Sequence, residues 1–365
     1  MLDKKISIIG LGLIGGSIAR ALRERLNILD ITAVDQNIES LNLALKEGYI
    51  VRGFLELNEF VYSSDIVFIC TPVKSTLEYI DILRDKVKPG CIITDTASTK
   101  REIVDYIDSL DNPPCFVGGH PMAGTEKTGF SASFAHLFEN AYYILSPAKS
   151  TTGPSISLMT EIIEGIGAIP VGIDAQEHDK IAAIISHVPH VIASALVSLV
   201  KNSDSSDGKM QLLAAGGFKD ITRIASSSPQ MWENIILSNK QEVKEALNNF
   251  IEALNSFNEY IDNNDSKNIY AFFESAKKYR DSFSSNRKGL ILPLNEIIVD
   301  VVDKPGIIGK IATILGKNGI NIKNINVSNS REFEQGCLRI TLPDSESVAN
   351  AFDMLSNKGY KVYKI

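Results

Sequence analysis

The chain has 365 residues, of which 44% are hydrophobic and 22% charged, and its formal net charge is −7 at pH 7. This length predicts two or three domains, and the acidic balance argues against nucleic acid or an anionic membrane as a general partner. The four cysteines are scattered without a C-x-x-C pair, which is typical of reduced thiols in a cytoplasmic protein and gives no sign of a metal site. We expect no signal peptide, because the first strand pattern begins almost at the N-terminus.

The clearest motif lies at residues 6–35. An apolar run at 6–9 predicts a buried strand, and glycines with G-x-G-x-x-G spacing follow it before a helix expected at 15–26. In this context the spacing predicts a dinucleotide-binding loop, in which the glycines permit the turn, the approach of a pyrophosphate and close packing of the helix. A strand at 31–34 ends at Asp35, 20 residues after Gly15, where a carboxylate can bind the ribose hydroxyls. No Lys or Arg occupies 36–38, so we expect NAD rather than NADP. The cofactor-binding residues expected here are Gly10, Gly12, Leu13, Ile14, Gly15 and Asp35.

Residues 1–172 alternate apolar runs with amphipathic stretches, which predicts a doubly wound parallel sheet of the Rossmann type. Further strands are expected at 65–70, 90–96, 141–146 and 168–173, and residues 116–121 are expected to be a strand that runs into a loop. Helices are expected at 38–47, at 76–86, from 97 onward and between 150 and 168. Thr71 and Pro72 follow the strand at 65–70. Because ligands bind beyond the carboxyl ends of such strands, both are expected at the cofactor.

Residues 173–285 carry helical periodicity only, with helices expected at 175–200 (split at Pro189), 226–237, 240–261 and 266–282. The apolar run at 181–200 approaches the length of a membrane span. It contains two histidines, a proline and several serines, and lacks an aromatic belt, so we expect a helix buried in protein rather than a membrane segment. The helices carry more apolar surface than a small bundle buries, which predicts a homodimer formed through this all-helical domain.

A polar stretch at 286–293 is the expected linker to a last domain at 294–365. Strands are expected at 295–302, 325–328, 336–342 and 360–363, and helices at 307–317 and 345–357. The order βαββαβ is that of the ferredoxin-like fold.

Three stretches place polar residues in apolar surroundings. His120 is expected just beyond the carboxyl end of a strand, with glycines around it, where it could act as a general base or merely bind the backbone. His187 and His190 interrupt the long apolar run and could bind substrate, form a satisfied core pair or bind metal, although no third ligand stands at an established spacing. Lys219 and Arg223 are four residues apart and could grip carboxylates or form a solvated face paired with Asp220.

Together with the glycine loop, these stretches resemble the prephenate dehydrogenase family of tyrosine biosynthesis. The matching segments span residues 1–285 in the order of the family and are Gly10–Ser17, Thr94–Lys100, Gly118–Glu126, Ser186–His190, Gly217–Arg223 and Trp232. Asp303–Gly306 and Gly319–Ile322 resemble an ACT-type regulatory domain, which some members of the family carry.

The resemblance implies NAD-dependent oxidative decarboxylation of prephenate to 4-hydroxyphenylpyruvate in the cytoplasm. It implies that His120 accepts the proton of the C4 hydroxyl and that Ser98 orients this histidine and contacts the nicotinamide. It also implies that Arg223 binds a substrate carboxylate, that the substrate site includes Lys219, His187 and His190, and that Glu126 helps gate it. No metal is implied.

The ACT-type resemblance implies inhibition by L-tyrosine and assembly beyond the dimer through pairing of these domains. The ligand is expected near Asp303, Pro305, Gly306, Asn321 and Ile322. Two alternatives stay open. One is an arogenate dehydrogenase on the same scaffold, and the other is a regulatory binding protein that senses NAD and an amino acid.

Overall fold

The computed structural model describes residues 4–125, 127–283, 295–302, 304–329 and 336–364. Its contacts divide the chain into two compact units, Met1–Ala253 and Leu254–Ile365. The linker expected at 286–293 lies outside the described residues.

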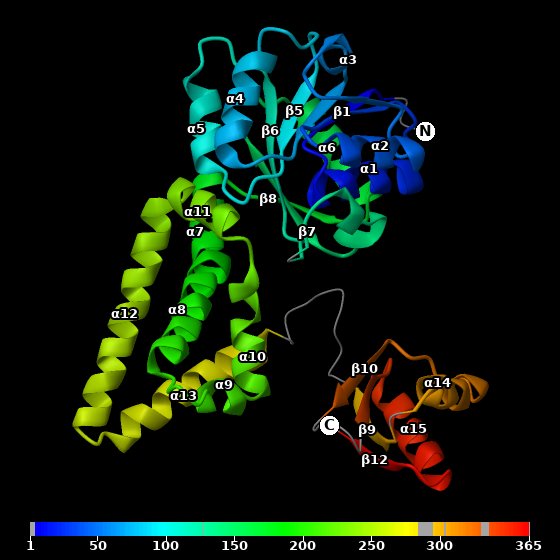
Figure 1. Ribbon diagram of the computed structural model, residues 1–365, viewed down its shortest axis with the longest axis vertical. Coiled ribbons are helices and arrows are strands. Elements are labelled where there is room, and N and C mark those ends of the chain that lie inside the picture. The colour runs from blue at the N-terminus through cyan, green and yellow to red at the C-terminus, as the bar shows by residue number, and fades with distance from the viewer. Residues whose placement is uncertain (1–3, 126, 284–294, 303, 330–335, 365) are drawn as a thin grey trace. The chain divides into compact units, whose positions relative to one another are not determined.

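The first unit is built on an eight-stranded sheet with the order β3-β2-β1-β4-β5-β6-β7-β8 (Figure 1). The strands are β1 (Ile6–Ile9), β2 (Ile31–Val34), β3 (Arg52–Phe54), β4 (Ile66–Ile69), β5 (Ile92–Asp95), β6 (Cys115–Pro121), β7 (Tyr142–Pro147) and β8 (Ile169–Gly172). All four residues of β1, β2, β4 and β5 are buried. This burial is expected of strands covered on both faces, and the predicted Rossmann-type sheet is confirmed.

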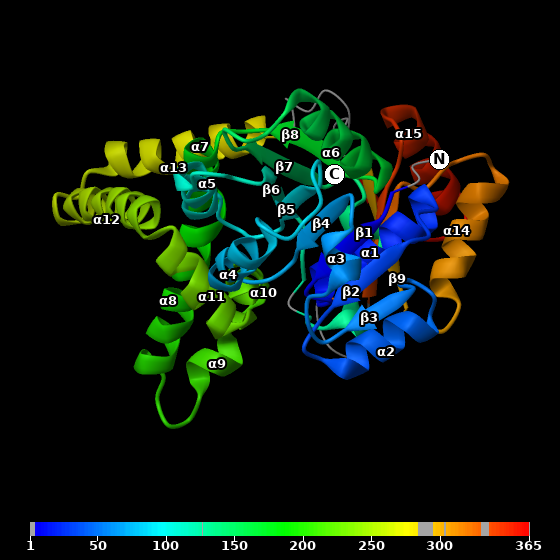
Figure 2. The same cartoon turned by 90° about the horizontal axis from the view of Figure 1, so that it is seen from above.

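Helices cover the sheet in two groups. One hydrophobic cluster contains core residues of α1 (Leu13–Leu26), α2 (Ile38–Lys46) and α6 (Gly153–Gly165). The other contains those of α3 (Glu59–Tyr62), α4 (Val73–Leu83) and α5 (Arg101–Ser109). Figure 2 shows this part of the chain from above, with α2 and α5 far apart along the sheet.

Two local expectations in this sheet are wrong. The helix expected from Ala97 onward begins only at Arg101. His120 does not stand beyond a strand end, because β6 runs to Pro121 and pairs antiparallel with β7, with His120 opposite Ile144. The antiparallel partner extends the strand through the glycines, and the ring of His120 is therefore held on a rigid element.

The first unit continues as helices. These are α7 (Ala175–Ala182), the π-helix η3 (Ala183–His187), α8 (Val188–Ser203), α9 (Lys209–Leu213), α10 (Gly216–Thr222), the 3-10 helix η4 (Arg223–Ser226), α11 (Pro229–Ser238) and the part of α12 (Lys240–Asp262) up to Ala253. The split expected at Pro189 is wrong, since helix runs from Ala175 to Ser203 without a break. Proline cannot donate to the i−4 carbonyl and its ring crowds it. The wider π turn just before Pro189 accommodates both effects.

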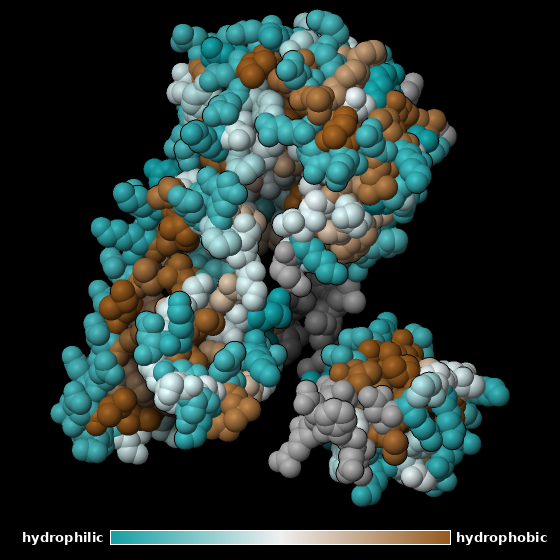
Figure 3. Space-filling view, in the orientation of Figure 1, coloured by the Kyte–Doolittle hydropathy of each residue, from teal (hydrophilic) through white to brown (hydrophobic). Residues whose placement is uncertain are grey.

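The helix Ala175–Ser203 is not buried within this chain. It is long and apolar enough to span a membrane by length and composition, and 22% of its apolar window is buried within the single chain. The expectation of a helix buried in protein therefore stays a prediction that depends on the expected homodimer. Large apolar side chains on it are more than half exposed, namely Ile184, Ile185 and Leu199. Figure 3 shows apolar surface over the helical part of the chain.

The second unit contains α13 (Ser266–Ser282) and a four-stranded sheet with the order β10-β11-β9-β12. Its elements are β9 (Glu296–Val301), α14 (Ile307–Lys317), β10 (Asn324–Asn329), β11 (Gly336–Thr341), α15 (Ser345–Asn357) and β12 (Lys361–Lys364). Core residues of α14, α15 and the sheet form one hydrophobic cluster. The predicted βαββαβ fold is confirmed.

Candidate active site

The glycine loop leaves room where a pyrophosphate has to approach. Gly10 has φ +90°, and a Cβ there would lie 2.5 Å from the carbonyl oxygen of Cys70. A Cβ on Gly15 would lie 2.0 Å from the carbonyl oxygen of Gly10, whereas a Cβ on Gly12 would meet nothing within 4 Å. Gly12 is the N-cap of α1 and provides no side-chain cap, so the first N–H groups of this 14-residue helix fit an anionic ligand.

Asp35 ties the end of β2 to this loop. Its carboxylate accepts hydrogen bonds from the backbone N–H of Leu11 at 2.5 Å and of Asn37 at 2.7 Å. Each oxygen keeps a second lone pair, which suits ribose hydroxyls. Leu13 and Ile14 open α1 and are half-buried.

Thr71 and Pro72 follow β4 on the same edge of the sheet. A Cβ on Gly10 would lie 3.0 Å from the Thr71 methyl carbon, and Pro72 is the N-cap of α4. The structure therefore brings together two of the segments expected to bind the cofactor, residues 10–15 and residues 71–72.

His120 lies in a chain of hydrogen bonds that the sequence did not reveal. Its Nδ1 is 2.8 Å from Nε2 of His178, and Nδ1 of His178 is 2.7 Å from Oδ1 of Asp179. His178 and Asp179 are 3% and 1% exposed. The carboxylate of Asp179 also accepts the backbone N–H of Lys100 at 2.7 Å and of Arg101 at 3.0 Å. The His178–Asp179 dipeptide beside the apolar run was the only signal for this arrangement.

The ring of His120 is held in its neutral form. Burial, and then the nearby His178, Lys100 and His187, lower the pKa of His120 well below its ordinary value. At neutral pH the imidazole is therefore unprotonated and can accept a proton.

A buried ion pair fixes the segments around His120. Lys100 and Asp95 are both 0% exposed and form an ion pair. The Asp95 carboxylate also accepts the backbone N–H of Gly119 at 3.1 Å and of Ala97 at 2.9 Å. This carboxylate thus ties β6 and the loop after β5 to one point. Burial lowers the pKa of Lys100, and Asp95 opposes that shift.

Ser98 lies in that loop and is half-buried. Within the described parts of the chain no hydrogen bond joins it to His120, whose Nδ1 is bonded to His178.

The histidine pair has separate partners. His187 is 1% exposed, and burial lowers its pKa to about 4. Its Nδ1 accepts a hydrogen bond from Nδ2 of Asn239 at 3.2 Å, so its proton is on Nε2. The ring of His190 stacks on Trp232 with centroids 3.8 Å apart, and its Nδ1 donates to the carbonyl oxygen of Ser186 at 2.9 Å. Among the described residues no cluster of three His, Cys, Asp or Glu could hold a metal.

Of the two cations Lys219 and Arg223, Arg223 lies near His190. Arg223 begins η4, and its charge helps to lower the pKa of His190 after the larger effect of burial, so the two groups are close. Lys219 lies in α10 and is exposed, as is Arg223. The alternative of an ion pair with Asp220 is not observed among the described residues.

Several expected residues belong elsewhere or are not described. Glu126 and Asp303 lie outside the described residues. Pro305 and Gly306 are exposed, and Gly306 has φ +86° as the N-cap of α14. Asn321 is exposed, while Ile322 packs on the core of the second unit.

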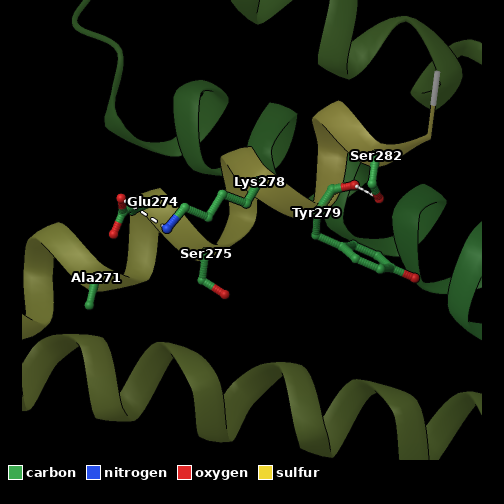
Figure 4. A pocket seen from close by; sticks show the side chains of 6 residues that line it. All are labelled: Ala271, Glu274, Ser275, Lys278, Tyr279 and Ser282. Atoms are coloured by element: carbon green, nitrogen blue, oxygen red, sulfur yellow. Dashed lines mark hydrogen bonds and ion pairs between the residues drawn. The ribbon is translucent and has the colours of Figure 1, made fainter. Parts of the chain in front are cut away.

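A recess of about 500 Å³ lies along α13 (Figure 4). Its six lining side chains come from that helix alone and include the ion pair of Glu274 and Lys278, at 3.1 Å. None of the candidate site residues lines this recess.

A Rossmann-type sheet, an open glycine loop and a neutral imidazole at the same sheet edge define a dinucleotide-dependent dehydrogenase. The chain matches the family models for the prephenate dehydrogenase nucleotide-binding domain over residues 18–171, the prephenate dehydrogenase dimerization domain over 174–275 and the ACT domain over 295–349. It is 38% identical to a prephenate dehydrogenase of Bacillus subtilis, over 93% of this chain and 92% of that protein. The chain belongs to the prephenate dehydrogenase family.

Solved structures agree with this assignment. A prephenate dehydrogenase of Aquifex aeolicus, in complex with hydroxyphenyl propionate and NAD+, has a TM-score of 0.72 and 32% identity over 78% of this chain and 99% of that chain. An arogenate dehydrogenase of Synechocystis has a TM-score of 0.68 and 27% identity over 76% of this chain and 99% of that chain.

Proposed function

We propose that this chain catalyses the NAD-dependent oxidative decarboxylation of prephenate to 4-hydroxyphenylpyruvate, with release of CO₂ and NADH, in L-tyrosine biosynthesis. The observation that carries the proposal is the neutral His120, which lies at the sheet edge of the open glycine loop in a member of this family.

Bound NAD+ would supply the hydride acceptor, and the loop at Gly12, the N-terminus of α1 and Asp35 would hold it. His120 accepts the proton of the substrate's C4 hydroxyl as the carbinol carbon is oxidised. Loss of the ring carboxylate as CO₂ then makes the ring aromatic, which drives the reaction forward. The protein's main tasks are therefore to position the substrate and to remove one proton.

The substrate is a dianion, and cations and donors near His190 suit it. We assign a carboxylate to Arg223, with Lys219 as a second cation. His187 presents its Nε2–H as a donor, because Asn239 occupies Nδ1, and His190 lies beside it. Glu126 is proposed to gate the site, and Ser98 to orient His120 and to contact the nicotinamide.

The test is to follow NADH formation with prephenate and with arogenate, using wild-type protein and His120→Asn. We expect turnover of prephenate, and a fall in kcat of about 10²–10⁴-fold in the variant, which is the span of a lost general base. Efficient use of arogenate alone would support the arogenate dehydrogenase alternative. No turnover with either substrate would favour a regulatory protein that senses NAD and an amino acid.

We further propose that L-tyrosine inhibits the enzyme by binding the ACT domain near Asp303, Pro305, Gly306, Asn321 and Ile322. The ACT domain match supports regulation by a small molecule. Removal of residues 294–365 should leave turnover intact and abolish inhibition. Inhibition of the shortened enzyme at the same tyrosine concentration would place the inhibitor at the active site.

The domain boundaries that we propose are 1–172, 173–285 and 294–365, with a linker at 286–293. The exposed apolar side chains of the helix Ala175–Ser203 and the dimerization domain match support a homodimer, with higher assembly through ACT pairing. We propose that the enzyme is cytoplasmic, without a nucleic acid or membrane partner.

A further inference from the structure

A hydrogen-bonded pair, His178 and Asp179, lies on the Nδ1 side of the His120 ring. His178 uses both of its ring nitrogens, Nδ1 toward Asp179 at 2.7 Å and Nε2 toward His120 at 2.8 Å. His178 also lines a cavity of about 260 Å³. Among the described residues, each ring nitrogen of His178 thus has one hydrogen-bond partner, His120 for Nε2 and Asp179 for Nδ1.

The direction of these hydrogen bonds follows from the acceptor at the end. An ionised carboxylate can only accept, so Nδ1 of His178 donates to Asp179. A neutral His178 then has a lone pair on Nε2 and can only accept there, so Nδ1 of His120 is the donor. A neutral imidazole carries one proton, and Nε2 of His120 is left as a bare lone pair.

We propose that His178 and Asp179 are positioning residues that fix His120 in the Nδ1–H tautomer, with Nε2 as the base for the substrate hydroxyl. This inference rests on the proposed function of His120. The hydroxyl proton moves to Nε2, and the O–H electron pair stays on the substrate oxygen as its carbonyl forms. The imidazolium keeps its Nδ1–H bond to His178, whose other side faces the negative charge of Asp179.

The position of Asp179 suits it to fix which ring nitrogens of His178 and His120 carry the protons. Its carboxylate accepts two backbone N–H groups, from Lys100 and Arg101, so its oxygens are fixed relative to the start of α5. It stands next to His178 in α7, and both are almost fully buried. The proton order at His120 is therefore set by an anchored carboxylate rather than by solvent.

The first test replaces the carboxylate by its amide. Oδ1 of Asp179 faces both Nδ1 of His178 and the backbone N–H of Lys100. In Asp179→Asn an amide nitrogen at this position donates to Nδ1 of His178 and gives up the bond from Lys100, which would move the His178 proton to Nε2 and the His120 proton from Nδ1 to Nε2. We expect kcat to fall by about 10²–10⁴-fold, as for a lost general base, while the KM for prephenate and the affinity for NAD+ stay within about twofold. His178→Phe, which keeps a ring and removes both hydrogen bonds, should lower kcat at least tenfold.

The matched control is Asp65→Asn. Asp65 also accepts a backbone N–H, from Lys5 at 2.7 Å, and pairs with Lys88 at 2.6 Å, but it precedes β4 at the opposite edge of the sheet. Its kcat should stay within about twofold of wild type. Thermal unfolding of all variants separates loss of fold from loss of turnover.

The second test reads the tautomer without turnover. The chain has only five histidines, so ¹⁵N NMR of histidine-labelled full-length protein can be assigned with single substitutions. We expect His120 protonated on Nδ1 in wild type and on Nε2 in Asp179→Asn. A wild-type His120 protonated on Nε2 would overturn the proposal, because His178 would then be the donor.

The outcomes separate this inference from the proposed function. If His120→Asn loses turnover while Asp179→Asn and His178→Phe keep normal kcat, the inference is wrong and the base assignment stands. If His120→Asn keeps normal kcat, both are wrong. If the wild type turns over neither substrate, the proposed function fails and the NMR result still decides the tautomer.

Discussion

The buried ion pair of Lys100 and Asp95 allows a stability prediction of definite size. Both side chains are 0% exposed. In Lys100→Met the carboxylate of Asp95 keeps the N–H groups of Gly119 and Ala97 but loses its counter-charge. Removal of one partner of a buried pair costs about 3–5 kcal/mol, and the two remaining hydrogen bonds argue for the lower end.

The expected change in Tm follows from that free energy. At about 2–4 °C per kcal/mol for a domain of 150–250 residues, a loss of about 3 kcal/mol lowers the Tm by about 6–12 °C. The assay is differential scanning calorimetry at pH 7. Lys88→Met is the matched control, because its pair with Asp65 spans 2.6 Å but its side chains are 39% and 28% exposed. An exposed pair contributes about 0–1 kcal/mol.

The double variant Asp95→Asn/Lys100→Met tests whether the unpaired charge of Asp95 causes the loss of stability in Lys100→Met. It removes the uncompensated charge and should recover part of the lost Tm, because Asn can still accept a backbone N–H. The reasoning is refuted if Lys100→Met shifts the Tm no more than Lys88→Met does, or if the double variant is less stable than the single one.

Three further predictions concern the proposed sites. His187 has a pKa of about 4 in the folded state against an ordinary 6.5, so as the pH drops the unfolded state binds this proton first. The free energy of unfolding should therefore fall between pH 6.5 and 4, by up to about 3 kcal/mol at 1.36 kcal/mol per pH unit. In His187→Asn the free energy of unfolding, measured with denaturant, should depend less on pH in this range, and an unchanged pH dependence would contradict this. Asp35→Ala should raise the KM for NAD+ by about tenfold or more, since it removes a charged hydrogen-bond acceptor worth about 1.5–3 kcal/mol. An unaltered preference for NAD+ over NADP+ would contradict the expected contact between Asp35 and the ribose. Arg223→Ala should chiefly raise the KM for prephenate, with Lys244→Ala on α12 as control; a fall in Tm at constant KM would indicate a structural arginine instead.

Local patterns predicted the elements that depend on local physics. The buried run at Ile6–Ile9 and the glycine spacing were sufficient for β1, the loop and α1, because a two-sided strand and a phosphate loop each need a continuous stretch of chain. The same holds for the βαββαβ order of the last domain. β7 was expected as a strand, but its antiparallel direction depends on pairing with β6, which no local pattern records. For this reason the sequence placed His120 after a strand rather than within one.

The helix around Pro189 shows a different limit. Proline is a reliable sign of a helix break from sequence, yet the π turn at Ala183–His187 lets the helix continue. A π turn has no sequence signature of its own, because it differs from an α-helix only by one residue in the hydrogen-bond spacing.

The support of His120 could not be read from the sequence, because its partners are distant in the chain. His120 and His178 are 58 residues apart, and Asn239 and Asp179 are 60 apart. Asp179 connects two parts of the site: its carboxylate reaches His120 through His178, and its backbone carbonyl accepts Nδ2 of Asn239 at 2.8 Å. The same Nδ2 donates to His187. The proposed base and the proposed substrate donor are therefore held by one residue through different groups. Replacement of the Asp179 side chain keeps its backbone carbonyl and should act on His120, whereas a change at Asn239 should reach His187 first.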